Sequence, residues 1–186
     1  MLPYPSPEIT SKLSMTNQTT LSLHANFLVI NKLGVLIMGE PNIGKSELTL
    51  ALLDRGHQMV CDDLVDLVYQ NNQLIGKCPA ITCGYILISD VGMMNVSKLF
   101  GTNAIISQYE INLIITLIKP ENKLKILDPF NPICEKETIL EVTLPKIILP
   151  VYTGRNLPLL IEILVRNQIL KKEGYDSSVN FNKHLK

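Results

Sequence analysis

The residues best suited to chemistry lie in one stretch, residues 39–46, which reads G-E-P-N-I-G-K-S. It matches the phosphate-binding pattern G-x-x-x-x-G-K-S/T over its full length. Backbone N–H groups of such a loop surround phosphate oxygens, Lys45 can reach the terminal phosphates, and the Ser46 hydroxyl can hold Mg²⁺. The sequence therefore predicts a nucleoside triphosphate site formed by Gly39, Glu40, Pro41, Asn42, Ile43, Gly44, Lys45 and Ser46.

The elements around this loop must position it. An apolar run at residues 35–38 predicts a strand before the loop, and residues 45–55 predict a helix after it that ends at Gly56. Residues 57–61 read as the next strand. The intervening segment is long enough for a βαβ unit, so we expect the two strands to be parallel neighbours. Whatever follows the second strand then shares one edge of the sheet with the loop.

Two adjacent carboxylates, Asp62 and Asp63, follow that second strand. Phosphoryl transfer needs a group that accepts the proton of the acceptor hydroxyl and a ligand for Mg²⁺. This pair can divide the two tasks, and it is the leading catalytic candidate. The alternative is a solvated turn after a strand, where Asp is common.

Two further candidates are His24 and Arg155. His24 lies within a predicted strand or pair of strands at residues 19–30, where it could contact phosphate, act as an acid or base, or be only structural. Arg155 comes just before a predicted helix at residues 157–173 with Asn156 as its N-cap. A guanidinium beside a helix start suits a phosphate, although it could equally be a turn that leads into the helix.

The length of 186 residues indicates a single domain, residues 19–180, between a flexible N-terminal segment at 1–18 and a tail at 181–186. We expect an α/β fold with a β-rich sheet and flanking helices. Residues 119–137 are polar and predict an exposed loop. The remaining predicted elements are a short helix at 96–101 and strands near 65–69, 73–76, 84–88, 112–118, 123–127 and 139–151.

The charge balance restricts the partners. Lys and Arg number 17, as do Asp and Glu, so the formal net charge is zero, which argues against binding to nucleic acid or to an anionic membrane surface. No apolar run is long enough to cross a bilayer, and the first residues lack the pattern of a signal peptide, so we expect a cytoplasmic protein. The four cysteines form no C-x-x-C pair and are predicted to be buried free thiols.

Together these motifs resemble the catalytic domain of bacterial HPr kinase/phosphorylase, over roughly residues 20–180. The resemblance rests first on the stretch from the loop to R-G-H at residues 55–57, and on the C-D-D that follows. It extends to L-F-G at 99–101, P-K-I at 145–147, P-V-x-x-G-R-N at 150–156 and N-x-x-L-K-K-E-G-Y at 167–175.

The resemblance implies a P-loop fold related to the core of phosphoenolpyruvate carboxykinase. It implies ATP- and Mg²⁺-dependent phosphorylation of a serine on the phosphocarrier HPr, and a reverse reaction that uses phosphate and yields pyrophosphate. It also implies a homo-hexamer. By position, His24 and Lys45 match active-site residues, Ser46 a Mg²⁺ ligand, and Arg155 a region tied to dephosphorylation. Either Asp62 or Asp63 matches the acid/base.

Two differences from the family pattern affect the predicted site. A Glu-Ile-Arg-Gly run of the family, which supplies a second Mg²⁺ ligand and an Arg, is replaced by L-I-S-D at residues 87–90, where Asp90 could restore a carboxylate. A further active-site Arg is missing near residues 127–130. The sequence therefore leaves two alternatives to the kinase: a catalytically weakened module that senses nucleotide or phosphate, and a P-loop kinase of a small molecule.

Overall fold

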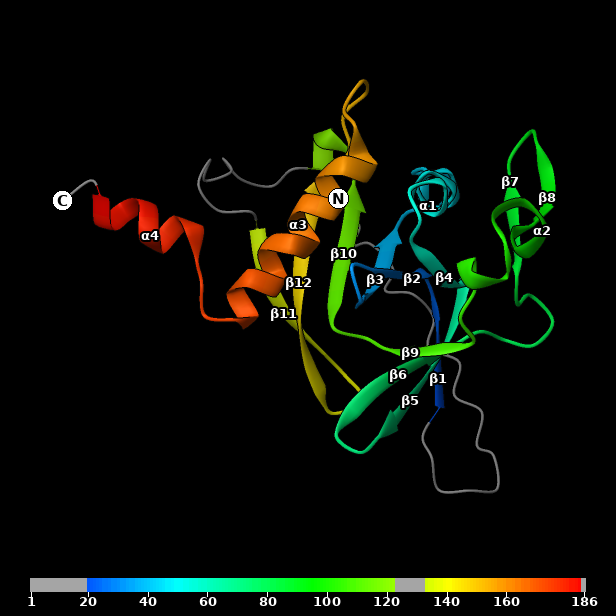
Figure 1. The fold of residues 1–186 in the computed structure, drawn as a ribbon, viewed down its shortest axis with the longest axis horizontal. Coiled ribbons are helices and arrows are strands. Elements are labelled where there is room, and N and C mark those ends of the chain that lie inside the picture. Colours follow the sequence, from blue (N-terminus) through cyan, green and yellow to red (C-terminus); the bar gives the residue numbers. More distant parts are fainter. Residues whose placement is uncertain (1–19, 123–132, 185–186) are drawn as a thin grey trace, which may run out of the picture.

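A six-stranded mixed sheet forms the centre of the protein (Figure 1). The structure is a computed structural model that describes residues 20–122 and 133–184. In spatial order the strands are β11 (Ile133–Ile139), β12 (Val142–Pro150), β10 (Leu113–Ile118), β3 (Leu33–Gly39), β2 (Asn26–Ile30) and β4 (Gln58–Cys61). The inner strands β12, β10 and β3 are parallel, whereas β11, β2 and β4 each pair antiparallel with their neighbour.

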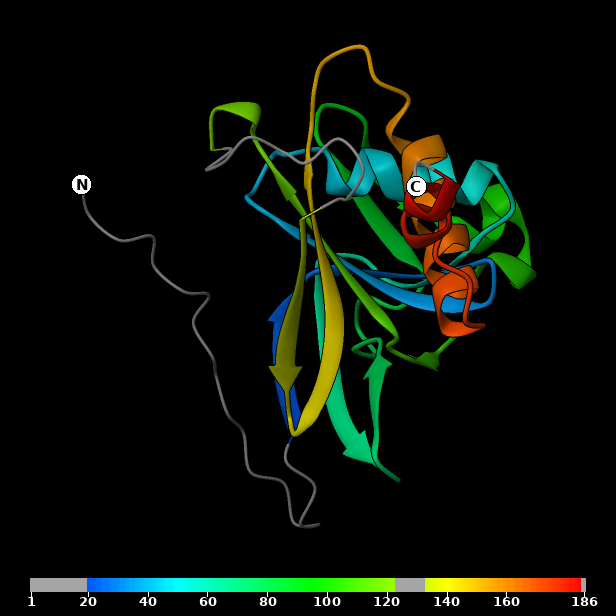
Figure 2. The ribbon, with the colours of Figure 1, turned by 90° about the vertical axis from the view of Figure 1, so that its left-hand side faces the viewer.

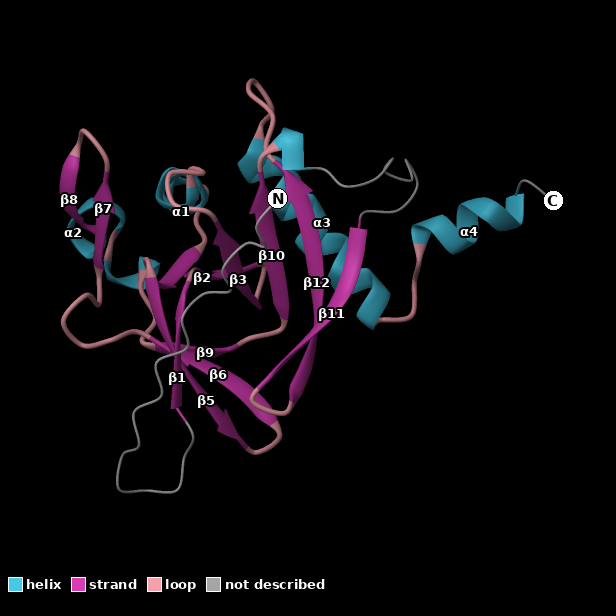
Figure 3. Ribbon diagram, turned by 180° about the vertical axis from the view of Figure 1, so that it is seen from behind, coloured by secondary structure: helices cyan, strands magenta, loops and turns pink. Residues whose placement is uncertain are grey.

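Four α-helices accompany the sheet: α1 (Lys45–Asp54), α2 (Val96–Phe100), α3 (Leu157–Lys172) and α4 (Ser177–His184). Helices α1 and α3 cover the same face, where Leu52 and Ile161 pack against Val35 and Leu113. Helix α3 lies in front of β10 and β12 in Figure 1 and behind them in Figure 3. Two short 3-10 turns, Thr102–Ala104 and Pro120–Asn122, complete the helical elements of the described residues.

A second, antiparallel sheet covers the opposite face of the central sheet. Its strands, in spatial order, are β1 (Thr20–His24), β5 (Leu64–Gln70), β6 (Gln73–Lys77) and β9 (Gln108–Glu110). Leu67 and Leu74 of this sheet share a core with Leu36 and Ile114 of the central one. Because β3 and β10 are buried on both faces, their sequences are continuous apolar runs. A separate hairpin, β7 (Tyr85–Ile88) and β8 (Gly92–Asn95), packs beside α1.

Most predicted elements that fall on described residues are present. The run at 19–30 is a pair of strands, β1 and β2, which belong to different sheets. The loop helix, the short helix closed by Gly101 and the helix capped by Asn156 are also present. The flexible segment predicted at 1–18 and the strand predicted at 123–127 lie outside the described residues.

The predicted neighbour relationship of β3 and β4 is wrong. The two strands run in the same direction, but β2 lies between them and pairs antiparallel with both. The cause is the two-residue turn Asn31-Lys32, whose φ angles of 48° and 64° suit a tight hairpin. This local hairpin places β2 beside β3, and the crossover through α1 must therefore reach one strand further.

Two segments are more regular than predicted. Residues 133–137, assigned to an exposed loop, belong to β11, which forms a hairpin with β12 (Figure 2). Because β11 is an edge strand, it carries charged side chains rather than an apolar pattern. Residues 181–184, expected to lie in the tail, belong to α4, and Asp176 Oδ1 accepts hydrogen bonds at its start from the backbone N–H of Ser178 and Val179. Strands β8 and β9 were not predicted.

No helix among the described residues has the length and hydrophobicity that a membrane span requires. The cysteine prediction is partly wrong. All four thiols are free and Cys61 is buried, but Cys78 and Cys83 are half-buried and Cys134 is exposed.

Candidate nucleotide and phosphate site

The glycine loop leaves β3 at Gly39 and enters α1 at Lys45. A Cβ atom at Gly39 would lie 2.9 Å from the carbonyl oxygen of Leu117, so this position must be glycine. Gly44, the N-cap of α1, has φ 94° and a left-handed conformation that also favours glycine. The first N–H groups of α1 have no carbonyl partner within the helix and carry its positive dipole end. The loop therefore fits a phosphate group.

Lys45 folds back onto this loop. Its Nζ donates to the carbonyl oxygens of Gly39 at 2.9 Å and Glu40 at 3.1 Å. The residue is buried, and burial lowers its pKa, while the carboxylates of Asp63 and Asp62 act in the opposite direction. The ammonium group is thus held beside the loop, where an anion can replace the two carbonyl partners.

The hydroxyl of Ser46 contacts the first of the two acidic residues. Ser46 Oγ donates to Asp62 Oδ1 at 3.1 Å and lies 3.4 Å from Oδ2. Asp62 follows β4, which runs in the same direction as β3, so both residues are at one edge of the sheet as the sequence predicted. A hydroxyl and a carboxylate in this arrangement are suitable oxygen ligands for Mg²⁺.

A buried amide that the sequence analysis missed holds Asp62 in place. Asn26 Nδ2 donates to Asp62 Oδ1 at 2.5 Å and to Thr49 Oγ1 at 2.9 Å, and Asn26 is fully buried. Its Oδ1 accepts from the backbone N–H of Asp63 at 3.4 Å. One asparagine thus orients both acidic residues. The available signal was a single amide at the start of the apolar run of β2.

Burial raises the pKa of Asp62 to about 6, although hydrogen bonds from Ser46, the backbone of Leu87 and Asn26 act in the opposite direction. The free-energy cost of removing the carboxylate from water exceeds the stabilisation that these hydrogen bonds provide. A cation placed beside this carboxylate would relieve that cost.

Asp63 differs from Asp62 in both exposure and partners. Its side chain is 68% exposed and its backbone is left-handed, with φ 68°. His24 Nε2 lies 3.1 Å from Asp63 Oδ1 and is itself 44% exposed. The backbone N–H of Ala25 donates to the Asp63 carbonyl, which fixes the end of β1 against this turn. The structure therefore brings His24 and Asp63 together as a pair.

These residues line one cavity of about 670 Å³. The β7–β8 hairpin closes it on one side, and this wall includes Asp90, whose possible role as a replacement carboxylate the sequence analysis raised. The lining residues are His24, Pro41, Asn42, Gly44, Lys45, Ser46, Glu47, Asp62, Asp63, Leu87, Ser89 and Asp90. In the described part of the chain, no three or more His, Cys, Asp or Glu side chains group to hold a metal ion by themselves.

Arg155 does not line this cavity. It lies between β12 and α3, is exposed, and places its guanidinium carbon 5.2 Å from the centre of the Tyr152 ring. Because β12 and β3 point the same way, Arg155 is at the same edge of the sheet as the loop, but two strands further along. Residues 127–130, near which the family has a further active-site Arg that this chain lacks, read L-D-P-F and lie outside the described residues.

The R-G-H segment after α1 has a structural contact. Arg55 and His57 both bind Glu162 of α3, at 2.5 Å and 2.8 Å. The hydrogen bond from Arg55 is the main reason that the pKa of Glu162 falls to about 2, with His57 adding to it. This buried carboxylate fastens α3 to the turn between α1 and β4. The sequence analysis gave His57 no such role.

Comparisons with known proteins all indicate the same protein family. A family model described as HPr Serine kinase C-terminal domain matches residues 14–185. The HPr kinase/phosphorylase of Chromobacterium violaceum is 41% identical over 161 residues, 86% of this chain and 51% of the relative. That of Neisseria meningitidis serogroup C is 36% identical over 182 residues, 95% of this chain and 57% of the relative. The chain thus spans about half the length of these curated relatives.

A solved structure is also similar. The Hpr(Ser) kinase/phosphatase from Coxiella burnetii has 58% sequence identity and a TM-score of 0.77, and the match covers 82% of this chain and 98% of that chain. The likeness confirms the predicted fold class.

Proposed function

The chain belongs to the HPr serine kinase C-terminal domain family, and from that premise we propose that it transfers the γ-phosphoryl group of ATP to a serine of the phosphocarrier HPr. We propose further that it catalyses the reverse reaction, in which phosphate removes the phosphoryl group and pyrophosphate forms. The observation that supports this best is the shared cavity of the glycine loop and the acidic pair. A donor phosphate and an acceptor hydroxyl can meet there.

The loop and α1 supply the nucleotide side of the reaction. Backbone N–H groups of residues 39–46, except Pro41, which has none, and the ammonium of Lys45 bind the phosphates. Lys45 exchanges its carbonyl partners for phosphate oxygens. Ser46 Oγ and Asp62 are the protein groups that would hold Mg²⁺, with Asp90 on the facing wall. When bound, Mg²⁺ neutralises charge that develops on the transferring phosphoryl group.

Asp63 supplies the acid/base chemistry in this proposal. Asp62 is buried and its Oδ1 already accepts from Ser46 and Asn26, so it cannot turn toward an acceptor without breaking that network. Asp63 is exposed in the cavity, and its neighbour His24 can orient it. In the forward direction Asp63 accepts the proton of the serine hydroxyl. The serine oxygen bonds to the γ-phosphorus, and ADP leaves. In reverse, Asp63 returns that proton to the departing serine oxygen.

Arg155 takes part only in the reverse reaction in this proposal. It lies at the same edge of the sheet but outside the cavity. Its family motif, G-R-N, precedes α3, whose N-terminus favours an anion. Replacing Arg155 should therefore affect phosphate-dependent dephosphorylation more than phosphorylation by ATP.

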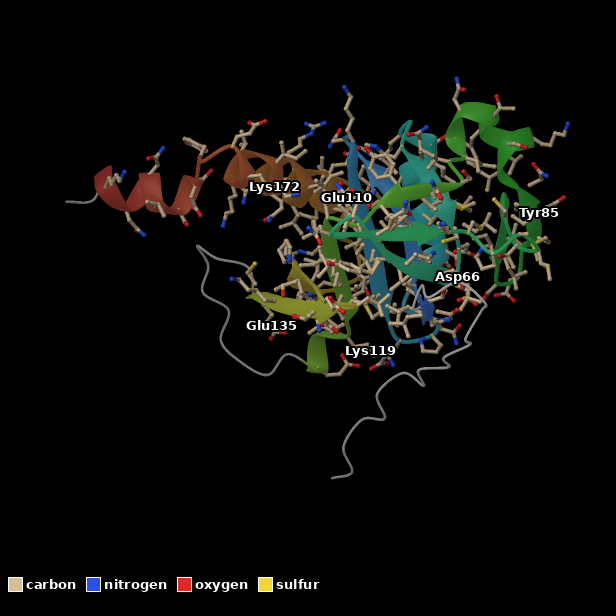
Figure 4. The ribbon with its side chains drawn as sticks, turned by 90° about the horizontal axis from the view of Figure 1, so that it is seen from below. Asp66, Tyr85, Glu110, Lys119, Glu135 and Lys172 are labelled. Atoms are coloured by element: carbon tan, nitrogen blue, oxygen red, sulfur yellow. The ribbon has the colours of Figure 1, made fainter. Side chains whose placement is uncertain are left out.

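The test is phosphotransfer with the purified chain, ATP, Mg²⁺ and HPr, followed by mass spectrometry of HPr. We expect one added phosphoryl group on a serine, and loss of the reaction in Lys45→Met. Lys172→Met is the matched control, because Lys172 is exposed at the end of α3 (Figure 4). Tight ATP binding without any transfer would instead favour the sensing module, and transfer only to a small metabolite would favour the third alternative.

We also propose that the chain assembles as a homo-oligomer, a hexamer by family analogy. Helix α4 projects from the body of the molecule (Figure 1) and exposes Val179 and Phe181, which are 52% and 47% exposed. Apolar side chains on a projecting helix suit contact with another copy. The monomer mass is 20.8 kDa, and light scattering should give six times this value. A monomer at micromolar concentration would contradict the proposal.

A further inference from the structure

The glycine loop begins beside the end of strand β10, the neighbour of β3 in the central sheet. The two strands are parallel, and Leu117 of β10 is in register with Gly39. They approach closely here, because a Cβ atom at Gly39 would lie 2.9 Å from the carbonyl oxygen of Leu117. Lys119 is the first residue after β10, so it leaves the sheet at the edge where the loop starts.

Lys119 forms an ion pair with the second residue of the loop. Its Nζ lies 3.4 Å from Glu40 Oε2, and the side chains of Lys119 and Glu40 are 52% and 24% exposed (Figure 4). The carbonyl oxygen of Glu40 accepts from Lys45 Nζ at 3.1 Å and from the backbone N–H of Ile43 at 3.4 Å. Glu40 therefore connects the internal hydrogen bonds of the loop to a cation on the neighbouring strand.

The carboxylate of Glu40 is unfavourable for the ligand that the loop fits. A polyphosphate brings several negative charges to residues 39–46, and a further negative charge in the same loop repels them. Lys45 is the cation that lines the cavity, whereas Lys119 does not line it. Lys119 can therefore act on a bound phosphate only through Glu40.

We propose that Lys119 is a positioning residue for the nucleotide, which neutralises the Glu40 carboxylate and holds it toward β10. The Glu40 carbonyl then stays beside Lys45, and the phosphates meet a loop without an uncompensated negative charge. The role of Lys119 rests on the proposed function for the identity of its ligand, ATP.

A purely mechanical role is the alternative, in which the ion pair only fastens the loop to β10. The two roles differ in what happens when both partners are replaced. If the pair acts through charge, removal of Lys119 exposes the carboxylate of Glu40, and Glu40→Gln in the same chain restores binding. If the pair acts as a fastening, the double variant binds as weakly as the single one.

The test is calorimetric titration of the full chain with ATP at about 0.02 M and about 0.5 M salt, conditions that leave exposed charges weakly and strongly screened. Lys119→Met should weaken ATP binding about threefold to tenfold at low salt, and this loss should shrink at high salt. Lys119→Arg should bind like the wild type, and the double variant with Glu40→Gln should recover most of the loss. Lys172→Met, at an exposed position at the end of α3, is the control and should bind normally.

Steady-state phosphotransfer to HPr supplies a second measurement. Lys119→Met should raise KM for ATP with little change in kcat, because it removes an interaction that the ground state and the transition state share. Its melting temperature should change little, since exposed ion pairs contribute little to stability. A normal melting temperature with weaker binding would show that the variant is folded and that the effect lies at the site.

Two results would overturn the role of Lys119: ATP binding by Lys119→Met as tight as in the wild type at low salt, or a loss that persists in the double variant and at high salt. The proposed function fails separately. A wild-type chain that binds ATP but transfers nothing to HPr would contradict that function and leave the role of Lys119 in binding intact. A wild-type chain that binds no ATP would contradict both.

Discussion

The Oγ atom of Ser46 and the Oδ1 atom of Asp62 lie 3.1 Å apart, and this contact joins the first turn of α1 to the end of β4. It places Asp62 beside the start of α1, on the side of the cavity that the glycine loop lines. Asp63, one residue later, points to a different partner, His24. Two adjacent carboxylates thus have separate surroundings, and substitutions should separate their roles.

Asp63→Asn should lower kcat for phosphorylation of HPr by about 100-fold or more, since general base catalysis contributes that much, and should leave nucleotide affinity nearly unchanged. Asp62→Asn should weaken Mg²⁺-dependent nucleotide binding as well. The measurements are steady-state phosphotransfer and calorimetric titration with Mg²⁺ and a non-hydrolysable ATP analogue. If Asp62→Asn lowers kcat alone and Asp63→Asn weakens binding, the two assignments must be exchanged.

The pH dependence of Mg²⁺-nucleotide binding should follow Asp62. Its pKa of about 6 in the free protein means that the carboxylate is largely protonated below pH 6 and must ionise to hold a cation. Affinity should therefore rise between about pH 5 and pH 7 and level off above. Binding measured in this range should lose most of its slope in Asp62→Asn. An unchanged slope in that variant would assign the titration to another group.

In the absence of ligand, the contribution of Asp62 to protein stability should have the opposite pH dependence to nucleotide binding. Its folded pKa of about 6 exceeds the ordinary value of 3.8, so the folded state binds more protons between these values and this contribution to stability falls as pH rises through that window. Two pKa units correspond to about 3 kcal/mol. The difference in melting temperature between Asp62→Asn and the wild type should therefore grow in favour of the variant from pH 4 to pH 6. A constant difference would contradict this.

Asn26→Ala should change the pKa of Asp62 without altering any residue that is proposed to contact a ligand. The substitution removes the buried donor at 2.5 Å, so the pKa of Asp62 should rise and the midpoint of pH-dependent nucleotide binding should move to higher pH. The loss of the hydrogen bonds of this buried amide should cost about 1–3 kcal/mol of unfolding free energy. Chemical denaturation and binding across pH test both effects. A loss of stability with an unmoved midpoint would show that Asn26 only packs.

Glu162→Ala should destabilise the fold by about 1–3 kcal/mol, because His57 loses its buried hydrogen-bond acceptor, whereas the exposed Arg55 can still be solvated. The ionised Glu162 has a pKa of about 2, below the ordinary value of 4.5, so its stabilising contribution is present above pH 4.5 and is lost as pH falls through 2. Urea denaturation at pH 7 is the measurement. Glu173→Ala, an exposed position at the end of the same helix, should stay within about 0.5 kcal/mol.

Local sequence patterns were sufficient to predict the glycine loop at residues 39–46 and the strand and helix that flank it. Residues 39–46 need glycine at two backbone positions and apolar residues before them, and both requirements are visible along the chain. The same is true of the α3 cap at Asn156, which the sequence predicted. The edge strand β11 was missed because an edge strand can be polar, so its pattern resembles a loop.

The sequence alone was enough to predict a glycine loop between a strand and a helix, and an acidic pair at the same edge of the sheet, because these features depend on short runs of adjacent residues. Only the tertiary structure decided which partner each member of the pair contacts. Ser46, Asn26 and Asp62 come from three separate parts of the chain. Arg55 and His57 come from the turn between α1 and β4, and their partner Glu162 comes from α3. Contacts between residues distant in sequence depend on sheet order, and sheet order here was set by the local β2–β3 hairpin, which placed one more strand between the loop and the acidic pair than the spacing alone suggested.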